Sequence, residues 1–239
     1  MLLGQVAMER LARSRVAVFG VGGVGGYVVE VLARSGVGAL DLFDNDRVSI
    51  TNCNRQIIAT VHNVGQYKVD VAAERILSIN PGCKVTTHKT FYLVSNADEV
   101  DLSVYDYVVD CIDTVSAKME LVRRCQRLGV SHICSMGAAN KLDPTAFRVL
   151  DSSETKNDPL AKVMRKHLRR EGIDHFKCVC SDEMPIEPIG EPAETAKNGT
   201  RAVPASNAFV PAAAGVIVGG EVVKDLIKAG TTRINVDTT

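Results

Sequence analysis

Residues 16–46, VAVFGVGGVGGYVVEVLARSGVGALDLFDND, contain the pattern that decides the fold. The apolar run at residues 16–19 is typical of a buried parallel strand, and residues 27–32 have apolar side chains at helical spacing. A second apolar run, at residues 40–43, ends in Asp44. Strand, glycine-rich turn, helix and strand in this order predict a βαβ unit of the dinucleotide-binding type.

The turn and the acidic residue beyond it predict a nucleotide site. In such a unit, backbone N–H groups at the start of the helix bind phosphate, and an acidic residue about 20 positions further on binds the ribose hydroxyls. Asp44 occupies the acidic position. The spacing GxGGxG is formed by Gly20, Gly22, Gly23 and Gly25. This pattern alone does not distinguish hydride transfer from phosphoryl or adenylyl transfer.

Strands and helices alternate along the first 150 residues. Apolar runs predict further strands at residues 84–87, 107–112, 132–135 and 147–150. Helical periodicity predicts helices at residues 2–11, 66–79 and 114–128. The alternation predicts an α/β fold with a Rossmann-like, doubly wound, mostly parallel sheet and helices on both faces. We expect a nucleotide-binding core at residues 1–150 and a C-terminal extension at residues 151–239, packed as part of the same domain.

The composition is close to neutral and gives no sign of a membrane protein. The 239 residues are 46% hydrophobic, and 28 basic residues balance 28 acidic ones, so no overall charge steers the chain to nucleic acid or membranes. The seven cysteines form no CxxC pair, which favours a reducing compartment. The longest apolar stretch, residues 208–220, is shorter than the roughly 18 residues of a membrane span. We expect a cytoplasmic protein without a signal peptide or membrane segment.

Polar residues that suit a triphosphate surround and follow the βαβ unit. In chain order they are Asp46, Asn52, Arg55, Gln56, Lys68 and Asp113. Arginine and lysine orient phosphate oxygens and stabilise the charge that builds on a leaving pyrophosphate. Asp113 follows a predicted strand and suits Mg²⁺, which binds through one or two carboxylates and substrate phosphates. A dehydrogenase needs no such set, so the sequence favours ATP and Mg²⁺ over a nicotinamide cofactor.

The motifs FGVGGVGG, DLFDNDRVSITNCNRQ, VGQYKVD and DCIDT resemble the adenylation domain of the ubiquitin-activating enzyme-like superfamily, which includes ThiF, MoeB and HesA. The resemblance covers roughly residues 3–137, and the pattern DxDxVxxxNxxRQ is its most specific part. It implies that the site activates a carboxylate as an acyl-adenylate. By the same resemblance, Asp44 binds ribose, Asn52 and Arg55 contact the ATP phosphates, Lys68 is the catalytic lysine and Asp113 holds magnesium. Arg55, Lys68 and Asp113 are then the catalytic residues.

Three later segments point to one branch of this superfamily. GAANKLDPT at residues 137–145, DPLAKVMRKHLRR at residues 158–170 and SDEMPIEP at residues 181–188 resemble tRNA threonylcarbamoyladenosine dehydratases. The resemblance implies an ATP-dependent cyclodehydration: the carboxylate of the threonylcarbamoyl group is adenylated, and a nucleophile within the group displaces AMP and closes a ring. Such an intramolecular attack needs no enzyme nucleophile, in agreement with the lack of a convincing Cys–His pair.

Two alternatives stay open. An adenylyltransferase for the C-terminus of a ubiquitin-like sulfur-carrier protein usually has two zinc-binding CxxC pairs, which this chain lacks. The second alternative is a module that binds a nucleotide without catalytic turnover. The resemblance also implies a homodimer. The arginine that relatives extend to the partner's ATP is either lost from this chain or replaced by Arg10 or Arg13. A monovalent cation (Na⁺ or K⁺) and a sulfur-transfer protein are further candidate partners. Cys178 and Cys180 are either sulfur-transfer residues or buried thiols.

Residues 158–172 predict an amphipathic helix with a basic side, formed by Lys162, Arg165, Lys166, Arg169 and Arg170. This is the densest basic cluster of a neutral protein. It is either a solvated helix face or a contact for the tRNA phosphate backbone. Residues 183–204, rich in proline, glycine and charge, predict a mobile surface loop, and residues 211–228 predict a closing helix.

Overall fold

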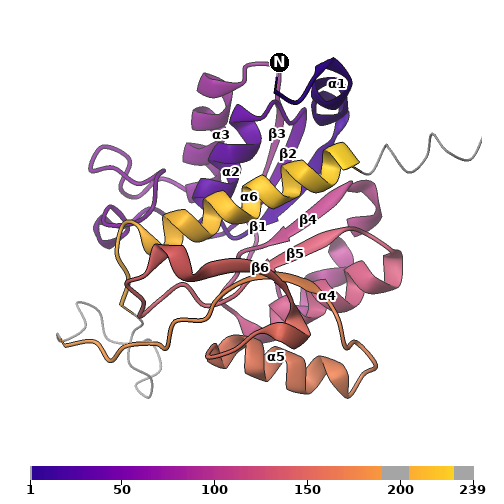
Figure 1. Ribbon diagram of the computed structural model, residues 1–239. Helices are drawn as coiled ribbons and strands as arrows, with labels where there is room; N and C mark the ends of the chain where they lie inside the picture. The colour runs from indigo at the N-terminus through magenta and orange to yellow at the C-terminus, as the bar shows by residue number, and fades with distance from the viewer. Residues whose placement is uncertain (1, 190–204, 229–239) are drawn as a thin grey trace, which may run out of the picture.

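The computed structural model describes residues 2–189 and 205–228 and contains one seven-stranded sheet (Figure 1). In spatial order the strands are β3 (Lys84–His88), β2 (Ala39–Phe43), β1 (Arg15–Phe19), β4 (Tyr107–Asp110), β5 (His132–Ser135), β7 (Lys177–Ser181) and β6 (Phe147–Asp151). All neighbouring strands are parallel except β7 and β6. The predicted α/β, Rossmann-like, mostly parallel sheet is confirmed.

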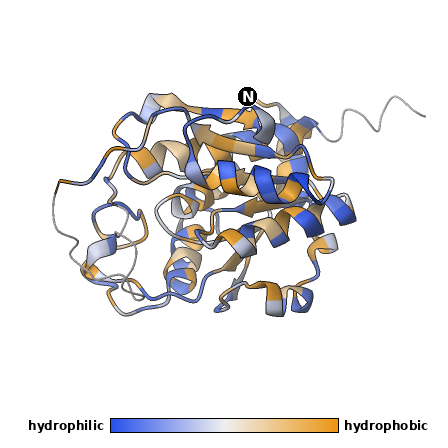
Figure 2. Cartoon of the chain, turned by 90° about the horizontal axis from the view of Figure 1, so that it is seen from below, coloured by the Kyte–Doolittle hydropathy of each residue, from blue (hydrophilic) through white to orange (hydrophobic). Residues whose placement is uncertain are grey.

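Helices cover both faces of this sheet. They are α1 (Gln5–Arg13), α2 (Gly25–Arg34), α3 (Lys68–Ile79), α4 (Val115–Leu128), α5 (Pro159–Arg169) and α6 (Val210–Lys228). Because successive strand residues point to opposite faces, Val16 and Val18 of β1 pack in the cluster that contains α2, α3 and α6. Ala17 and Phe19 pack on the other face, with α4. Hydrophobic and hydrophilic residues both occur along the helices in view, as an amphipathic cover requires (Figure 2).

The order of strands reverses between β1 and β4, and this reversal positions the site. β1 connects through α2 to β2 on one side, whereas β4 pairs with the other side of β1. All three strands are parallel, so Phe19, Phe43 and Asp110 end at the same edge of the sheet. Ligands of doubly wound sheets bind at such a switch point, outside the carboxyl ends of the strands.

Helix α6 belongs to the C-terminal extension but packs on the first βαβ unit. It lies along α2 (Figure 1). An added Cβ at Gly215 would lie 2.4 Å from the carbonyl oxygen of Val24, and one at Gly219 would lie 2.8 Å from Val31 Cβ. Glycines therefore allow the two backbones to approach closely. At the far end of α6, Arg10 Nη1 donates a hydrogen bond to the carbonyl oxygen of Ile227, at 2.6 Å.

Several boundaries differ from the predictions, and one strand was missed. Helix α2 begins at Gly25 and β4 ends at Asp110, whereas the apolar pattern had suggested residues 27 and 112. Strand β7, KCVCS, was not predicted, because five residues with two cysteines carry little strand signal. Residues 190–204 of the predicted loop and residues 229–239 of the extension lie outside the described residues. Within the described part of the chain, no helix is long and apolar enough to span a bilayer.

Candidate active site

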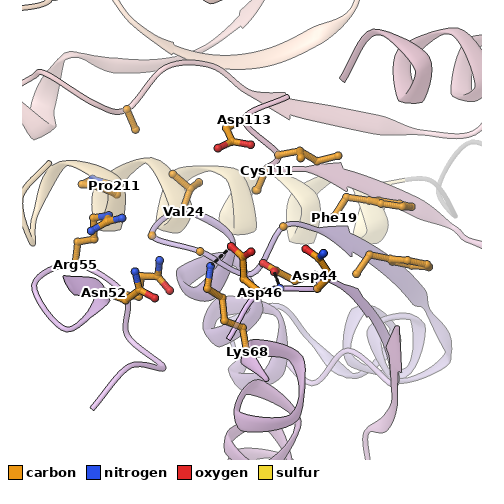
Figure 3. Close-up of a pocket in the computed structure, with 18 of the residues that line it drawn as sticks. Phe19, Val24, Asp44, Asp46, Asn52, Arg55, Lys68, Cys111, Asp113 and Pro211 are labelled. Carbon is orange, nitrogen blue, oxygen red and sulfur yellow. Dashed lines mark hydrogen bonds and ion pairs between the residues drawn. The ribbon is translucent and has the colours of Figure 1, made fainter. Parts of the chain in front are cut away.

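A cavity of about 480 Å³ lies at the switch point (Figure 3). Its walls come from the glycine turn, the residues after β2, the 52–56 loop, the start of α3 and the residues after β4 and β5. The N-terminal end of α6 closes one side through Pro211. Almost all of the ATP-site residues predicted from the sequence line this one cavity.

The glycine turn brings backbone, without side chains, to the floor of the cavity. Gly20 has φ +85°, and an added Cβ would lie 2.7 Å from the carbonyl oxygen of Cys111. A Cβ added at Gly22 would meet no atom closer than 3.8 Å, so this position leaves room for a ligand. Helix α2 begins directly after this turn without a side-chain cap, and such a helix start suits an anion.

Gly25 lies apart from the other three glycines of the turn. It does not line the cavity; an added Cβ would lie only 1.8 Å from the carbonyl oxygen of Gly20. Gly25 is therefore needed for the close packing of the helix start against the turn. Backbone sterics therefore require glycine at residue 25, although this residue does not contact the cavity.

Asp44 follows β2 and is held by two backbone amides. Its Oδ2 accepts a hydrogen bond from Val21 N and its Oδ1 accepts one from Asp46 N, both at 2.8 Å. Burial raises the pKa of Asp44, and the nearby charge of Lys68 opposes this shift. A carboxylate oxygen accepts more than one hydrogen bond, so both oxygens can still accept from the hydroxyls of a ribose.

Lys68 and Asp46 form an ion pair at the start of α3. The Lys68 side chain is only 8% exposed, whereas that of Asp46 is 63% exposed; Nζ and Oδ2 are 2.8 Å apart. The Lys68 backbone N–H also donates to the carbonyl oxygen of Asp46, at 3.0 Å. These contacts hold the ammonium group inside the cavity. There it can donate to a phosphate oxygen, either in place of Asp46 or together with it.

The loop after β2 supplies further polar groups. The guanidinium of Arg55 is held by the carbonyl oxygen of Thr51 and by Asn54 Oδ1, at 3.0 and 2.9 Å. Asn52 Oδ1 accepts from Ser49 N and stabilises the turn. Gln56 is 6% exposed, and its buried Oε1 has no hydrogen-bond partner among the described residues. Because a buried acceptor without a partner is unfavourable, Gln56 suits a bound ligand.

Asp113 faces Lys68 and Asp46 from the other side of the cavity (Figure 3). Its carboxylate is exposed, and Thr114 Oγ1 lies 3.4 Å from Oδ1. No group of three potential metal-binding side chains exists in the described ranges. The donor set nevertheless fits Mg²⁺, because this ion binds with one or two carboxylates when substrate phosphates supply other ligands.

An aromatic wall next to Asp44 was not predicted. Phe19 stacks on Phe43 with 4.3 Å between ring centroids, and Tyr92 meets Phe19 edge-on at 4.9 Å. All three line the cavity. Flat apolar surface at this end suits a nucleobase, since the glycine turn and Lys68 occupy the other end. Tyr92 belongs to an irregular segment without a sequence pattern, so only the fold could place it here.

The basic helix is confirmed as a helix, but one of its cations points inward. Lys162, Lys166, Arg169 and Arg170 are exposed, and Arg169 forms a 3.1 Å ion pair with Asp174. Arg165, in contrast, donates to the carbonyl oxygen of Thr155 at 2.6 Å and to that of Ser152 at 3.3 Å. Its guanidinium is engaged by backbone carbonyls, unlike those of the four exposed cations, and its role in tRNA binding stays a prediction.

Cys178 and Cys180 are buried thiols, which was one of the two alternatives predicted for them. Both are buried in β7 under α5, at 0% and 1% exposure, and burial raises the pKa of Cys180 to about 12. Sulfur transfer needs an accessible thiolate, and a buried thiol of high pKa does not supply one. These two cysteines are core residues.

Comparisons with known proteins agree with the geometry. The model of the ThiF family matches residues 1–236. A tRNA threonylcarbamoyladenosine dehydratase of Bacillus subtilis (strain 168) is 46% identical, over 95% of this chain and 92% of the relative. The corresponding dehydratase of Escherichia coli (strain K12) is 38% identical, over 83% and 77%.

Solved structures of the E. coli enzyme TcdA share the whole architecture. The crystal structure in complex with AMP has a TM-score of 0.88 and 33% sequence identity, and it covers 97% of this chain and 93% of that one. The complex with ATP has a TM-score of 0.86 with the same identity and coverage. The chain therefore belongs to the ThiF family, in the group of the tRNA threonylcarbamoyladenosine dehydratases.

Proposed function

We propose that this enzyme catalyses the ATP-dependent cyclodehydration of threonylcarbamoyladenosine in tRNA, through adenylation of its carboxylate. The observation that carries the proposal is the convergence of Asp44, Arg55 and Lys68 on one cavity at the glycine turn, in a chain that is similar to dehydratases over nearly its whole length. AMP and pyrophosphate are the expected products from ATP.

The roles of the residues follow from their chemistry. Asp44 binds the ribose hydroxyls, while the turn formed by Gly20, Gly22 and Gly23 approaches the phosphates. Asn52, Arg55 and Gln56 orient the triphosphate. The substrate carboxylate attacks the α-phosphorus, and pyrophosphate leaves; Lys68 stabilises the charge that builds up in this step. An atom of the same threonylcarbamoyl group then attacks the activated carbonyl carbon, and AMP leaves as the ring closes.

Other parts of the proposal concern partners and ions. Mg²⁺ held by Asp113 would neutralise phosphate charge. Lys162, Lys166, Arg169 and Arg170 of α5 are proposed to contact the tRNA backbone, which their exposure supports. We also propose a cytoplasmic homodimer in which residues 1–150, the adenylation core, and residues 151–239 act as one domain. A monovalent cation and a sulfur-transfer protein remain candidate partners without a specific residue.

Nucleoside analysis tests the reaction directly. The purified protein is incubated with ATP, Mg²⁺ and tRNA that carries linear threonylcarbamoyladenosine, and the digested nucleosides are weighed by mass spectrometry. We expect the modified nucleoside to lose the mass of one water, in step with AMP release. The alternative activity predicts two other results: the nucleoside is unchanged, and the C-terminus of a ubiquitin-like carrier that ends in Gly-Gly is adenylated. These results would establish the sulfur-carrier adenylyltransferase instead.

A further inference from the structure

A buried ion pair lies behind the cavity, between α4 and the ends of two strands. Lys118 is 0% exposed and Asp110, the last residue of β4, is 1% exposed. Their Nζ and Oδ2 atoms are 2.9 Å apart. Neither residue lines the cavity. A buried pair of this kind is weak evidence for stability by itself, so the contacts around it matter.

The remaining contacts of the pair converge on one peptide. Asp110 Oδ1 accepts a hydrogen bond from the N–H of Ile112, at 3.1 Å. Lys118 Nζ donates to the carbonyl oxygen of the same residue, also at 3.1 Å. The pair thus holds Ile112 at both of its backbone polar groups. The Ile112 carbonyl is part of the peptide bond between Ile112 and Asp113. The orientation of this peptide bond therefore sets the positions of the Asp113 Cα and Cβ atoms.

The Lys118 ammonium group also reaches the neighbouring strand β5. Lys118 Nζ donates to the carbonyl oxygen of Ser135, the last residue of β5, at 2.9 Å. The ammonium therefore makes two hydrogen bonds, to carbonyl oxygens after β4 and at the end of β5, and an ion pair with Asp110 at the end of β4. This arrangement fixes the spacing of two strand ends at the edge of the sheet where the cavity lies.

Asp113 itself has little else to fix its position. Its carboxylate is exposed, and the contact from Thr114 Oγ1 is long, at 3.4 Å. The precision with which this carboxylate faces Lys68 must come from the backbone before it. Orienting groups behind a ligand typically change metal affinity or activity 10- to 100-fold when they are removed.

We infer that Lys118, together with Asp110, is a positioning residue of the adenylation site, which holds the peptide before Asp113 so that the Asp113 carboxylate faces the ATP phosphates. This inference rests on the proposed role of Asp113. It assigns no contact with substrate to Lys118. The effect of replacing Lys118 is therefore expected to depend on the presence of Asp113. A purely structural effect would occur with or without Asp113.

The test is a double-mutant cycle on the binding of ATP in the presence of Mg²⁺, measured by calorimetry on the full-length protein. We expect Lys118→Met to raise the dissociation constant about 10-fold in the wild-type background. In the Asp113→Ala background the same substitution should change it less than about twofold, because the group that Lys118 positions is gone. The magnesium concentration that gives half-maximal ATP–pyrophosphate exchange should also rise for Lys118→Met.

Asp41→Asn is the matched control, because Asp41 is equally buried and ion-paired, but none of its partners lines the cavity. It should leave the magnesium dependence unchanged. Equal effects of Lys118→Met with and without Asp113 would overturn the inference. Wild-type exchange by Asp113→Ala alone would instead overturn the proposed role of Asp113. If Lys118→Met does not fold, the double substitution Asp110→Asn, Lys118→Met leaves no unpaired buried charge and enters the cycle in its place.

Discussion

Lys68 reaches the cavity from the first turn of α3, and its surroundings determine what its removal should do. Its ion-pair partner Asp46 is largely exposed, so water can solvate the Asp46 carboxylate when the ammonium is lost. Lys68→Ala should therefore retain the fold, while ATP–pyrophosphate exchange falls about 100-fold or more, as for the loss of one donor to a developing charge.

The control for this prediction is Lys84→Ala, an exposed lysine on β3 that does not line the cavity. It should leave the exchange rate unchanged. Thermal unfolding of both variants separates a local effect from a loss of structure. Wild-type exchange by Lys68→Ala would refute the assignment of the catalytic lysine.

Single residues also show how far the sequence can lead. Asp44, Asn52, Arg55 and Lys68 were predictable because the βαβ unit and the loop after it fix their places within one short stretch. The inward turn of Arg165 was not predictable, because its acceptors are backbone carbonyls of Ser152 and Thr155, which no side-chain pattern reveals.

Among the elements, α6 depends on small residues where it meets α2. Gly219→Ala would place Cβ 2.8 Å from Val31 Cβ, whereas Gly220→Ala meets nothing within 4 Å. We expect Gly219→Ala to lower the free energy of unfolding by about 1–3 kcal/mol through overpacking. Gly220→Ala should raise it by about 0.5–1 kcal/mol, because alanine favours a helix. Urea unfolding of both variants measures the difference, and equal effects would contradict this account of the contact.

Helix α5 has an exposed basic side whose effect should depend on salt. Lys166 and Arg170 lie one turn apart on that side. Lys166→Glu with Arg170→Glu should weaken tRNA binding at least about 10-fold and reduce the slope of log affinity against log salt by about 2. The same change of charge at Arg34 and Lys84 is the control. Equal tRNA binding by the α5 variant and the control would reject the proposed surface.

The elements also mark a second limit of sequence reasoning. Strand β7 has five residues and becomes a strand because β5 and β6 flank it. The aromatic wall and the Lys118–Asp110 pair arise in the same way, from segments that meet only in the folded sheet. Local periodicity cannot report such contacts, because tertiary packing decides them.

In the whole molecule, Asp41 connects the β1–β3 side of the sheet and should make its stability depend on pH. Burial would raise the pKa of Asp41, but hydrogen bonds and charges of Arg15 and His88 outweigh it and lower the pKa. A carboxyl with a lowered pKa stabilises the fold above its unfolded pKa of about 3.9, and this contribution is lost as the pH falls.

Asp41→Asn should therefore lower the free energy of unfolding by about 2 kcal/mol at pH 7. The difference from the wild type should shrink steadily below about pH 4. Urea unfolding at a series of pH values measures it. A difference that stays constant down to pH 2 would show that Asp41 contributes through packing alone.

The packing of α6 against the glycine turn has a consequence for protein synthesis. Pro211 closes the cavity beside Gly23, and Gly215 meets the carbonyl oxygen of Val24. The ribosome makes the turn early and α6 late, so a nascent chain that already contains β1 to β5 still lacks one wall of its nucleotide cavity. Contacts between segments so far apart in sequence form slowly. The side of α2 that faces α6 therefore stays uncovered until the last helix has been made.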